Sequence, residues 1–382
     1  TIRRGHERVL AARLADAEFF FDEDLKVPLA ARLADLEHVV YQSELGSMAE
    51  KSSRLARLVR KECERLGADE EMSRAVERAA TLAKCDLVTH MVTEFPDLQG
   101  TVGAIYAAEN GEGKRVSRAI GEQYMPRRLG DSLPGTTEGA LLSIAEKVDN
   151  LAASFGLGHV PTGSEDPYAL RRQALGVAMI TIDHGFAFGV PPLVRESASL
   201  LEAEARGFRW TDEAEGAFCD FFTARMRGFF TERGYRYDLV EAVLALDWGV
   251  PLLAQRRLDA LARSRETGQL NALHKSFERC HNLSKGQRAG QSDDGLLVEP
   301  AERALLSAFD EAQAAVDEAL STLDFAGVLD ALEVLCEPVD RLFDEVLIMA
   351  EDQALRESRL SLLARLDALF GLAADFSRLT GD

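Results

Sequence analysis

The sequence predicts an all-α protein. Apolar residues recur at helical spacing along most of the 382-residue chain, and no alternating run is long enough to build a sheet. Hydrophobic residues make up 46% of the chain and charged residues 28%, which is typical of a globular protein. This length allows two or three domains, each with its own core. We therefore expect helical domains in succession.

The N-terminal part predicts a helix that ends early, followed by a complete helical domain. In residues 1–25, Leu10, Leu14 and Ala17 share one face before an expected break at 22–24, so we interpret this stretch as the end of a preceding element. The chain opens without Met and without an apolar signal core, which indicates a fragment of a longer protein. Helices interrupted by glycine-containing turns, such as 110–113, then indicate a domain over residues 26–189.

The stretch PTGSEDPYALRRQALG, residues 161–176, predicts a helix start late in that domain. Gly163 and Ser164 suit a turn. Asp166 can accept hydrogen bonds from the free N–H groups of a starting helix, and Pro167 fits the first helical position, where no N–H is needed.

Arg171 and Arg172 follow near the positive end of that helix dipole, where unpaired cations are unfavourable. We therefore expect both to have anionic partners. Nearby Asp or Glu side chains and RNA phosphate both remain open as these partners.

A connector is expected over residues 190–214, and a second helical domain over residues 215–382. An apolar stripe near its start predicts core positions at Phe218, Phe222, Met226 and Phe229. Pro338 interrupts a later helical seam, so we expect a kink or two helices meeting near Cys336. The residues of that seam are Val328, Leu332, Leu335, Val339, Leu342, Val346 and Met349.

Charge and cysteine content restrict the class of partner and the compartment. The net charge is −20, yet residues 216–300 hold 12 Lys and Arg against 11 Asp and Glu, so this stretch is relatively basic. Five cysteines without metal-ligand spacing indicate reduced thiols in a cytoplasmic protein. The most apolar run, 175–194, contains charged residues and two prolines, so no membrane role is expected. Candidate phosphate-binding residues in the basic stretch are Arg225, Arg227, Arg256, Arg257, Lys275 and Lys285.

Several motifs resemble one family, in the order in which that family has them. They are ERVLAARLADAEFFF (7–21), KCDLV (84–88), EFPDLQG (94–100), EQYMPR (122–127), AEKVDNL (145–151) and the 161–176 stretch. Together they resemble the β subunit of bacterial heterotetrameric glycyl-tRNA synthetase, and the resemblance spans nearly the whole chain.

The resemblance implies that the first domain is similar to the HD superfamily, whose phosphohydrolases hold metal with His and Asp side chains. Cys85 and Asp86 occupy the place of the His-Asp pair, and Asp149 that of the final Asp. Two isolated carboxylates rarely hold a catalytic metal. We therefore expect a degenerate HD-like domain with no metal site and no catalytic residues.

The resemblance also implies that the second domain is a helical-bundle anticodon-binding domain, similar to that of arginyl-tRNA synthetase. Arg279 and Asn282 match the family pattern, whereas Phe277 and Glu278 replace its Asn and Lys. Phe277 is a candidate for stacking on an exposed base, with a core position as the alternative.

The implied function is recognition of glycine tRNA, including its anticodon, by a non-catalytic part of glycine-tRNA ligase. The implied partner is the α subunit, in a heterotetramer of two α and two β subunits, where ATP and Mg²⁺ are used; this fragment needs no cofactor. Two alternatives stay open: a metal-dependent HD phosphohydrolase with relocated ligands, and a helical interaction module without RNA binding.

Overall fold

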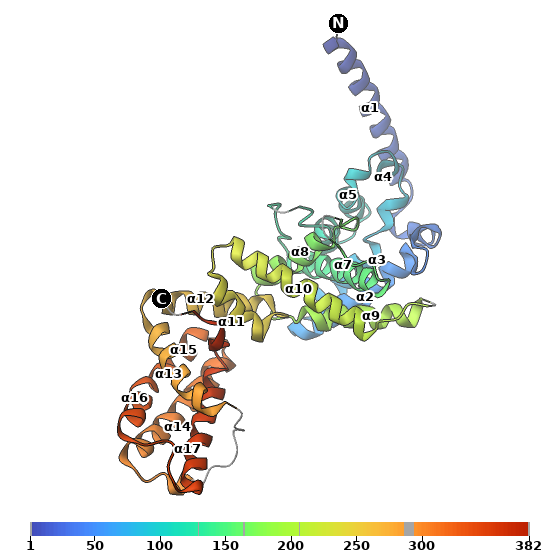
Figure 1. Ribbon diagram of the computed structural model, residues 1–382. Coiled ribbons are helices and arrows are strands. Elements are labelled where there is room, and N and C mark those ends of the chain that lie inside the picture. The colour runs from blue at the N-terminus through green and yellow to red at the C-terminus, as the bar shows by residue number, and fades with distance from the viewer. Residues whose placement is uncertain (1, 129, 163–164, 206, 286–293, 381–382) are drawn as a thin grey trace. The chain divides into compact units, whose positions relative to one another are not determined.

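The structure is a computed structural model that describes residues 2–128, 130–162, 165–205, 207–285 and 294–380. Within these residues the chain is helical almost throughout (Figure 1), and its strands are one short antiparallel pair, β1 (Val40–Gln42) and β2 (Gly46–Ser47). The all-α prediction is confirmed.

The chain divides into two compact units, Thr1–Arg225 and Met226–Asp382. The division lies within one continuous helix, α10 (Asp212–Glu232). Residue 215, the expected start of the second domain, belongs to the same helix. The aromatic stripe of α10 is core as predicted, since Phe218, Phe222 and Met226 are at most 1% exposed.

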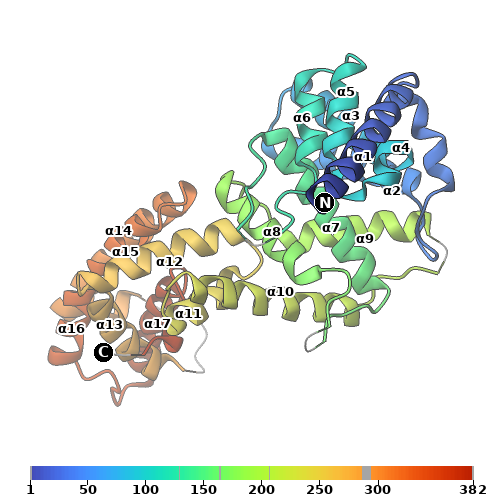
Figure 2. The same cartoon turned by 90° about the horizontal axis from the view of Figure 1, so that it is seen from above.

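The first unit is built around helix α7 (Thr137–Gly156), which is buried along nearly its whole length. It packs against α2, α3, α6, α8 and α9 (Figure 2), and its alanines let these neighbours approach closely. The elements of this unit are α1 (Ile2–Leu25), η1 (Leu29–Leu33), η2 (Asp35–His38), α2 (Met48–Leu66), α3 (Glu70–Leu82), η3 (Cys85–Val88), α4 (His90–Glu94), η4 (Pro96–Leu98), α5 (Thr101–Glu109), α6 (Lys114–Glu122), α8 (Leu170–Asp183) and α9 (Val190–Glu204).

Helix α1 continues past the predicted break at residues 22–24, so that prediction is wrong. Asp24 is buried, and its carboxylate accepts hydrogen bonds from the backbone N–H groups of His90 and Met91 at 3.0 and 2.9 Å. It also pairs with Arg32 at 3.1 Å. Asp24 thus satisfies free N–H groups at the start of α4. This acidic residue is a buried helix cap and not part of an exposed chain break.

Most of the connector expected over residues 190–214 is helical, because residues 190–204 form helix α9. Pro191 and Pro192 lie in its first turn, where backbone N–H groups have no intrahelical acceptor, so they start this helix instead of preventing it. Leu193, Val194 and Ser197 are buried, and α9 packs on α7.

Helix α8 starts later than predicted. Asp166 does accept from the starting helix, but the N–H groups are those of Leu170 and Arg171, at 2.7 and 3.0 Å. Pro167 precedes the helix, and Ala169, at φ 55°, is its N-cap residue. The turn predicted at Gly163 and Ser164 lies outside the described residues.

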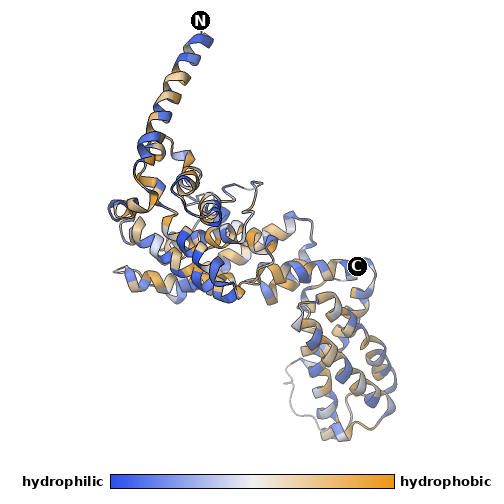
Figure 3. Ribbon diagram, turned by 180° about the vertical axis from the view of Figure 1, so that it is seen from behind, coloured by the Kyte–Doolittle hydropathy of each residue, from blue (hydrophilic) through white to orange (hydrophobic). Residues whose placement is uncertain are grey.

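The second unit is a helical bundle in which α13 packs against α17, α14 against α15 and α16, and α12 against α15. Figure 3 shows apolar and polar residues together along these helices, as in amphipathic helices. The elements are α11 (Tyr237–Asp247), α12 (Pro251–Glu266), α13 (Gln269–Ser284), η5 (Asp294–Leu296), α14 (Pro300–Ser321), α15 (Phe325–Glu333), α16 (Cys336–Glu345), α17 (Gln353–Phe370) and η6 (Phe376–Arg378).

The predicted interruption near Pro338 is confirmed as two helices. Helix α15 ends at Glu333 and α16 begins at Cys336, so Pro338 lies in a first turn, where it removes no helical hydrogen bond. The predicted seam is buried across this junction except at its end, since Met349 is 56% exposed.

No described helix has both the length and the apolar character needed to cross a bilayer. Each of the five cysteines is a free thiol.

Candidate functional site

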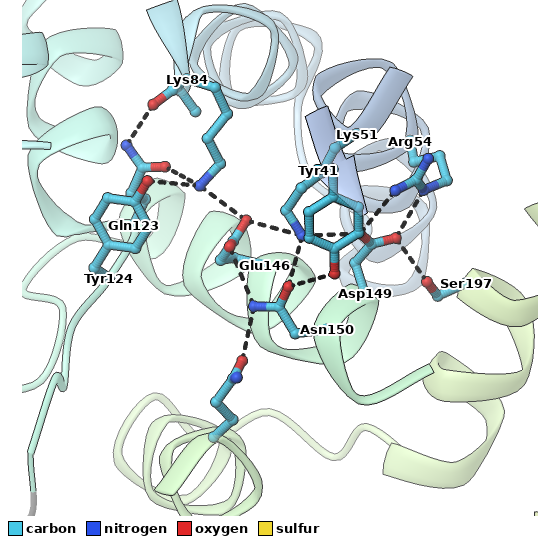
Figure 4. Close-up of polar contacts among 12 residues, drawn as sticks. Tyr41, Lys51, Arg54, Lys84, Gln123, Tyr124, Glu146, Asp149, Asn150 and Ser197 are labelled. Carbon is cyan, nitrogen blue, oxygen red and sulfur yellow. Dashed lines mark hydrogen bonds and ion pairs between the residues drawn. The ribbon is translucent and has the colours of Figure 1, made fainter. Parts of the chain in front are cut away.

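A buried ion network occupies the interior of the first unit, around Asp149 on α7 (Figure 4). Lys51 and Arg54 on α2 approach this carboxylate at 2.9 and 3.0 Å, and Ser197 on α9 donates a hydrogen bond to it at 3.0 Å. The Arg54 contact is bidentate, through Nε and Nη2. Both oxygens of Asp149 are therefore used by side chains of this unit.

Glu146, one turn earlier on α7, continues the network. Lys84 lies 3.0 Å from its carboxylate and Lys51 lies 3.5 Å from it. The Lys84 amine also donates to the side-chain oxygens of Gln123 and Tyr124, at 2.8 and 2.9 Å. Glu204 lies 3.3 Å from Arg54 as well, so three carboxylates balance the charge of the three buried cations. Such pairing is the condition for burying charges at tolerable cost.

The pKa values in this network follow from burial and from the opposing charges. Burial alone would raise the pKa of both carboxyl groups, but Lys51 and Arg54 hold the pKa of Asp149 well below its usual range. Lys51 and Lys84 likewise lower the pKa of Glu146 to about 2. Both groups are therefore ionised at neutral pH.

Lys147 differs from the network lysines because it lacks a carboxylate partner at ion-pair distance among the described residues. Its amine donates to the carbonyl oxygen of Met125 at 2.9 Å and to the hydroxyl of Ser143 at 2.6 Å. Burial lowers the pKa of Lys147 to about 7, against an opposing effect of Glu146.

Cys85 and Asp86, expected at the degenerate His-Asp position, are buried and have local structural roles. Burial raises the pKa of the Cys85 thiol to about 12, so this thiol is protonated at neutral pH. Asp86 accepts hydrogen bonds from the N–H groups of Gly100 and Gly103, at 2.5 and 3.2 Å, and so caps the start of α5.

The predicted degenerate positions are thus not assembled into one cluster, since Asp86 binds the start of α5 and Asp149 binds Lys51 and Arg54. Among the described residues, no group of three or more His, Cys, Asp or Glu side chains is placed to hold a metal ion. The arrangement provides fixed positive charge beside Asp149 from lysine and arginine side chains. Its contacts join α2, α7 and α9 through side chains.

The sequence analysis did not identify Lys51, Arg54 or Tyr41 as members of this network. Tyr41 lies on β1, with the Lys51 amine 4.4 Å from the centre of its ring, and its hydroxyl donates to Asn150 at 2.8 Å. Lys51 lies four and seven residues before the buried Leu55 and Leu58. The position of Lys51 on the same helical face as these apolar residues is the signal from which its burial could have been predicted.

In the second unit, Lys275, Arg279 and Asn282 lie on one face of α13, because they are spaced four and three residues apart. Lys275 and Arg279 share the carboxylate of Asp340 on α16, at 2.9 and 2.7 Å. Asn282 is exposed, and its side chain has no hydrogen-bond partner within the described part of the chain. This strip, Lys275, Arg279 and Asn282, is hereafter the α13 strip.

Phe277 is not available for stacking on a base in this structure, which corrects that expectation. It is 5% exposed and packs against Phe370 and Phe376, with ring centres 6.3 and 5.5 Å away, and stacks on His281 at 4.9 Å. Because Phe277 is two residues from Lys275 on a helix, its side chain points to a different face.

The other predicted phosphate-binding residues differ in their existing contacts. Arg227 pairs with Glu241, and Arg257 pairs with Asp247 at 2.5 Å and donates to the carbonyl oxygen of Ala373 at 2.8 Å. These contacts give both arginines a structural role. Arg225 is partly exposed, with its guanidinium 5.9 Å from the ring centre of Phe221. Arg256 and Lys285 are exposed and have no ion pair within the described residues.

Arg171 and Arg172 lie in the first turn of α8, in the first unit. Arg171 donates to the carbonyl oxygen of Glu165 at 3.5 Å. Arg172 is exposed, and its side chain makes no ion pair with any described carboxylate. The structure therefore places these two arginines in a different compact unit from the α13 strip.

Fold and site together define an all-helical protein of two units, one with a buried ion network at its centre and one with a cationic helix face. The sequence profile described as glycyl-tRNA synthetase beta subunit matches residues 1–245, and that described as DALR anticodon binding domain matches residues 273–375. The chain belongs to the glycyl-tRNA synthetase beta subunit family.

Relatives named "Glycine--tRNA ligase beta subunit" are similar over almost the whole chain. The protein of Desulforudis audaxviator is 42% identical over 99% of this chain and 54% of its own length. The protein of Citrifermentans bemidjiense is 41% identical over 99% of this chain and 54% of its own length. The protein of Vibrio parahaemolyticus is 40% identical over 98% of this chain and 54% of its own length. The chain thus spans about half the length of the curated relatives it matches.

Proposed function

We propose that this chain is the tRNA-recognition part of a glycyl-tRNA synthetase β subunit in the cytoplasm. It binds glycine tRNA, including the anticodon, through its second unit. Glycine attachment, with ATP and Mg²⁺, takes place at an α subunit in a heterotetramer of two α and two β subunits. The chain itself supplies binding energy and position, and no reacting group.

The observation that carries this proposal is the α13 strip, which lies within the residues that match an anticodon-binding profile. Its two cations share one carboxylate, so the strip keeps an excess of positive charge on a protein of net charge −20. Cations in a limited area favour RNA phosphate there, while the acidic remainder repels polyanions. Asn282 adds an exposed amide that can hydrogen-bond to a base edge.

The first unit supports this function as a scaffold. Its predicted phosphohydrolase positions are used for a helix cap and for ion pairs to lysine and arginine.

The test is a binding titration of the chain with glycine tRNA and with the same tRNA carrying an altered anticodon. We expect the altered tRNA to bind more weakly. Replacing Lys275 and Arg279 together by alanine should lower the affinity for both tRNAs about tenfold or more, because charge-assisted contacts contribute about 1.5–3 kcal/mol each. The slope of log affinity against log salt should fall by about one to two.

Arg263→Ala is the matched control, since Arg263 is an exposed arginine on α12 of the same unit. It should leave the affinity almost unchanged. Equal, weak binding to every tRNA would contradict anticodon reading. Equal loss in Arg263→Ala and in the double variant would contradict the role of the α13 strip and favour an interaction module without specific RNA binding.

A further inference from the structure

A small cavity lies beside the ion network in the first unit. Its volume is about 300 Å³, and it is lined by the segment around Tyr124 and Arg127, by Lys147 on α7, and by Arg172 and Gln173 at the start of α8. Tyr124, Glu146 and Asn150, which Figure 4 shows in the network, also border the cavity. The EQYMPR and ALRRQALG motifs, far apart in the sequence, therefore meet at one hollow.

Two guanidinium groups, of Arg127 and Arg172, and the Lys147 amine, whose pKa burial lowers to about 7, line this cavity. The guanidinium of Arg127 donates to the carbonyl oxygens of Asp97 and Gln99, at 3.2 and 2.5 Å, and lies 5.4 Å from the ring centre of Tyr124. Within the described residues, Arg127, Lys147 and Arg172 have no carboxylate at ion-pair distance. Glu146 is a carboxylate of the lining, but Lys51 and Lys84 already share its charge. The lining therefore has an unbalanced positive charge.

The backbone around the cavity is adapted to these side chains. A Cβ atom at Gly176 would lie 2.7 Å from Cε of Lys147, so glycine is what allows the lysine stem to pass α8. Asp166 caps the first N–H groups of α8 and leaves Arg172 in its first turn.

We propose that this cavity binds a phosphate monoester. A monoester carries close to two negative charges at neutral pH, which matches a lining with more than one unneutralised cation. The forked donors of Arg127 and Arg172 suit phosphate oxygens. A volume of about 300 Å³, at the small end of the range for ligand sites, suits a terminal phosphate with its sugar. This inference does not rest on the proposed anticodon recognition, which involves the other unit.

The ligand chemistry has two sources, a free sugar phosphate and the 5′-phosphorylated end of an RNA. We would titrate the chain calorimetrically with ribose 5-phosphate and ribose, and with a short RNA carrying either a 5′-phosphate or a 5′-hydroxyl. In at least one pair the phosphorylated member should bind at least about tenfold more tightly, the difference expected for one charge-assisted group. Preference in the RNA pair alone identifies an RNA end, and preference in the sugar pair identifies a free ester.

Arg172→Glu should weaken binding of the phosphorylated probe about tenfold or more, and Arg127→Ala should weaken it severalfold. Arg172 and Arg127 are exposed, so the fold should persist. The control is Arg74→Ala, because Arg74 is an exposed arginine of the same unit whose one ion pair within the described residues is with Glu70, four residues earlier. Equal binding within both probe pairs, or the same affinity in Arg172→Glu and Arg74→Ala, would overturn the proposal. Loss of anticodon discrimination would leave it unaffected.

Discussion

The same arrangement, one aspartate between two cations, occurs in both units at opposite degrees of exposure. In the first unit, Asp149 pairs with Lys51 and Arg54, and all three side chains are at most 1% exposed. In the second, Asp340 pairs with Lys275 and Arg279 at similar distances, but these side chains are 32–58% exposed. Distances alone therefore do not distinguish the two clusters.

Exposure decides what each cluster can do. Removing a partner from a buried pair leaves an uncompensated charge away from water, which costs several kcal/mol. An exposed pair is screened by solvent and contributes little to folding. The cations of the α13 strip can therefore exchange Asp340 for a ligand, whereas those around Asp149 are committed to the fold.

The largest expected effect is that of Asp149→Asn. It removes the charge that Lys51 and Arg54 share, so the free energy of unfolding should fall by about 3–5 kcal/mol, as for other broken buried pairs. Urea unfolding followed by circular dichroism measures this change. A loss below about 1 kcal/mol, the range of exposed pairs, would show that burial does not separate the two clusters.

Lys147→Met should change how stability depends on pH. Burial lowers the pKa of Lys147 from 10.5 to about 7, while Glu146 opposes this and Lys84 adds to it. Between these values the unfolded chain binds the proton and the folded chain does not, so stability should rise with pH across this window, by about 1.4 kcal/mol per pH unit at most.

The variant should lose that rise. The measurement is the difference in unfolding free energy between the two proteins at several pH values, so that other titrating groups cancel. Parallel curves for the two proteins would mean that Lys147 stays protonated when buried.

The smallest effect on stability is expected for Asp340→Asn. Its partners are exposed, so the free energy of unfolding should change by less than about 1 kcal/mol. Because the variant frees two cations and removes a negative charge, affinity for glycine tRNA should rise severalfold at low salt. Stability and affinity falling together would show that Asp340 orders the α13 strip for binding.

The sequence predicted the fold class, the family and the helix junction near Cys336, because these depend on spacing and on local motifs. Patterns of this kind can be recognised within a single segment of the sequence. Where the prediction failed, a local signal had a second meaning: Pro191 and Pro192 start α9, and Phe277 follows the apolar face of α13 into the core.

The phase of Lys51 with an apolar stripe could have indicated its burial, but not the residue with which it pairs. Lys51 and Asp149 lie 98 residues apart, on helices that come together only when the core is formed. Nothing in the sequence around Lys51 specifies a partner, because a lysine on a helix is usually solvated. The same holds for the cavity, where Arg127 and Arg172 belong to separate motifs.

The contacts of Asp24 also show which part of α1 packs against the rest of the first unit. Its carboxylate caps α4 and accepts a hydrogen bond from Tyr106, and Phe21 packs on the Tyr106 ring at 5.4 Å. Val9, Leu10 and Leu14 are more than 60% exposed. A protease acting on α1 should therefore trim it readily up to about residue 16 and stop before Phe21, so the durable N-terminal boundary of this unit lies inside a helix and not at a loop.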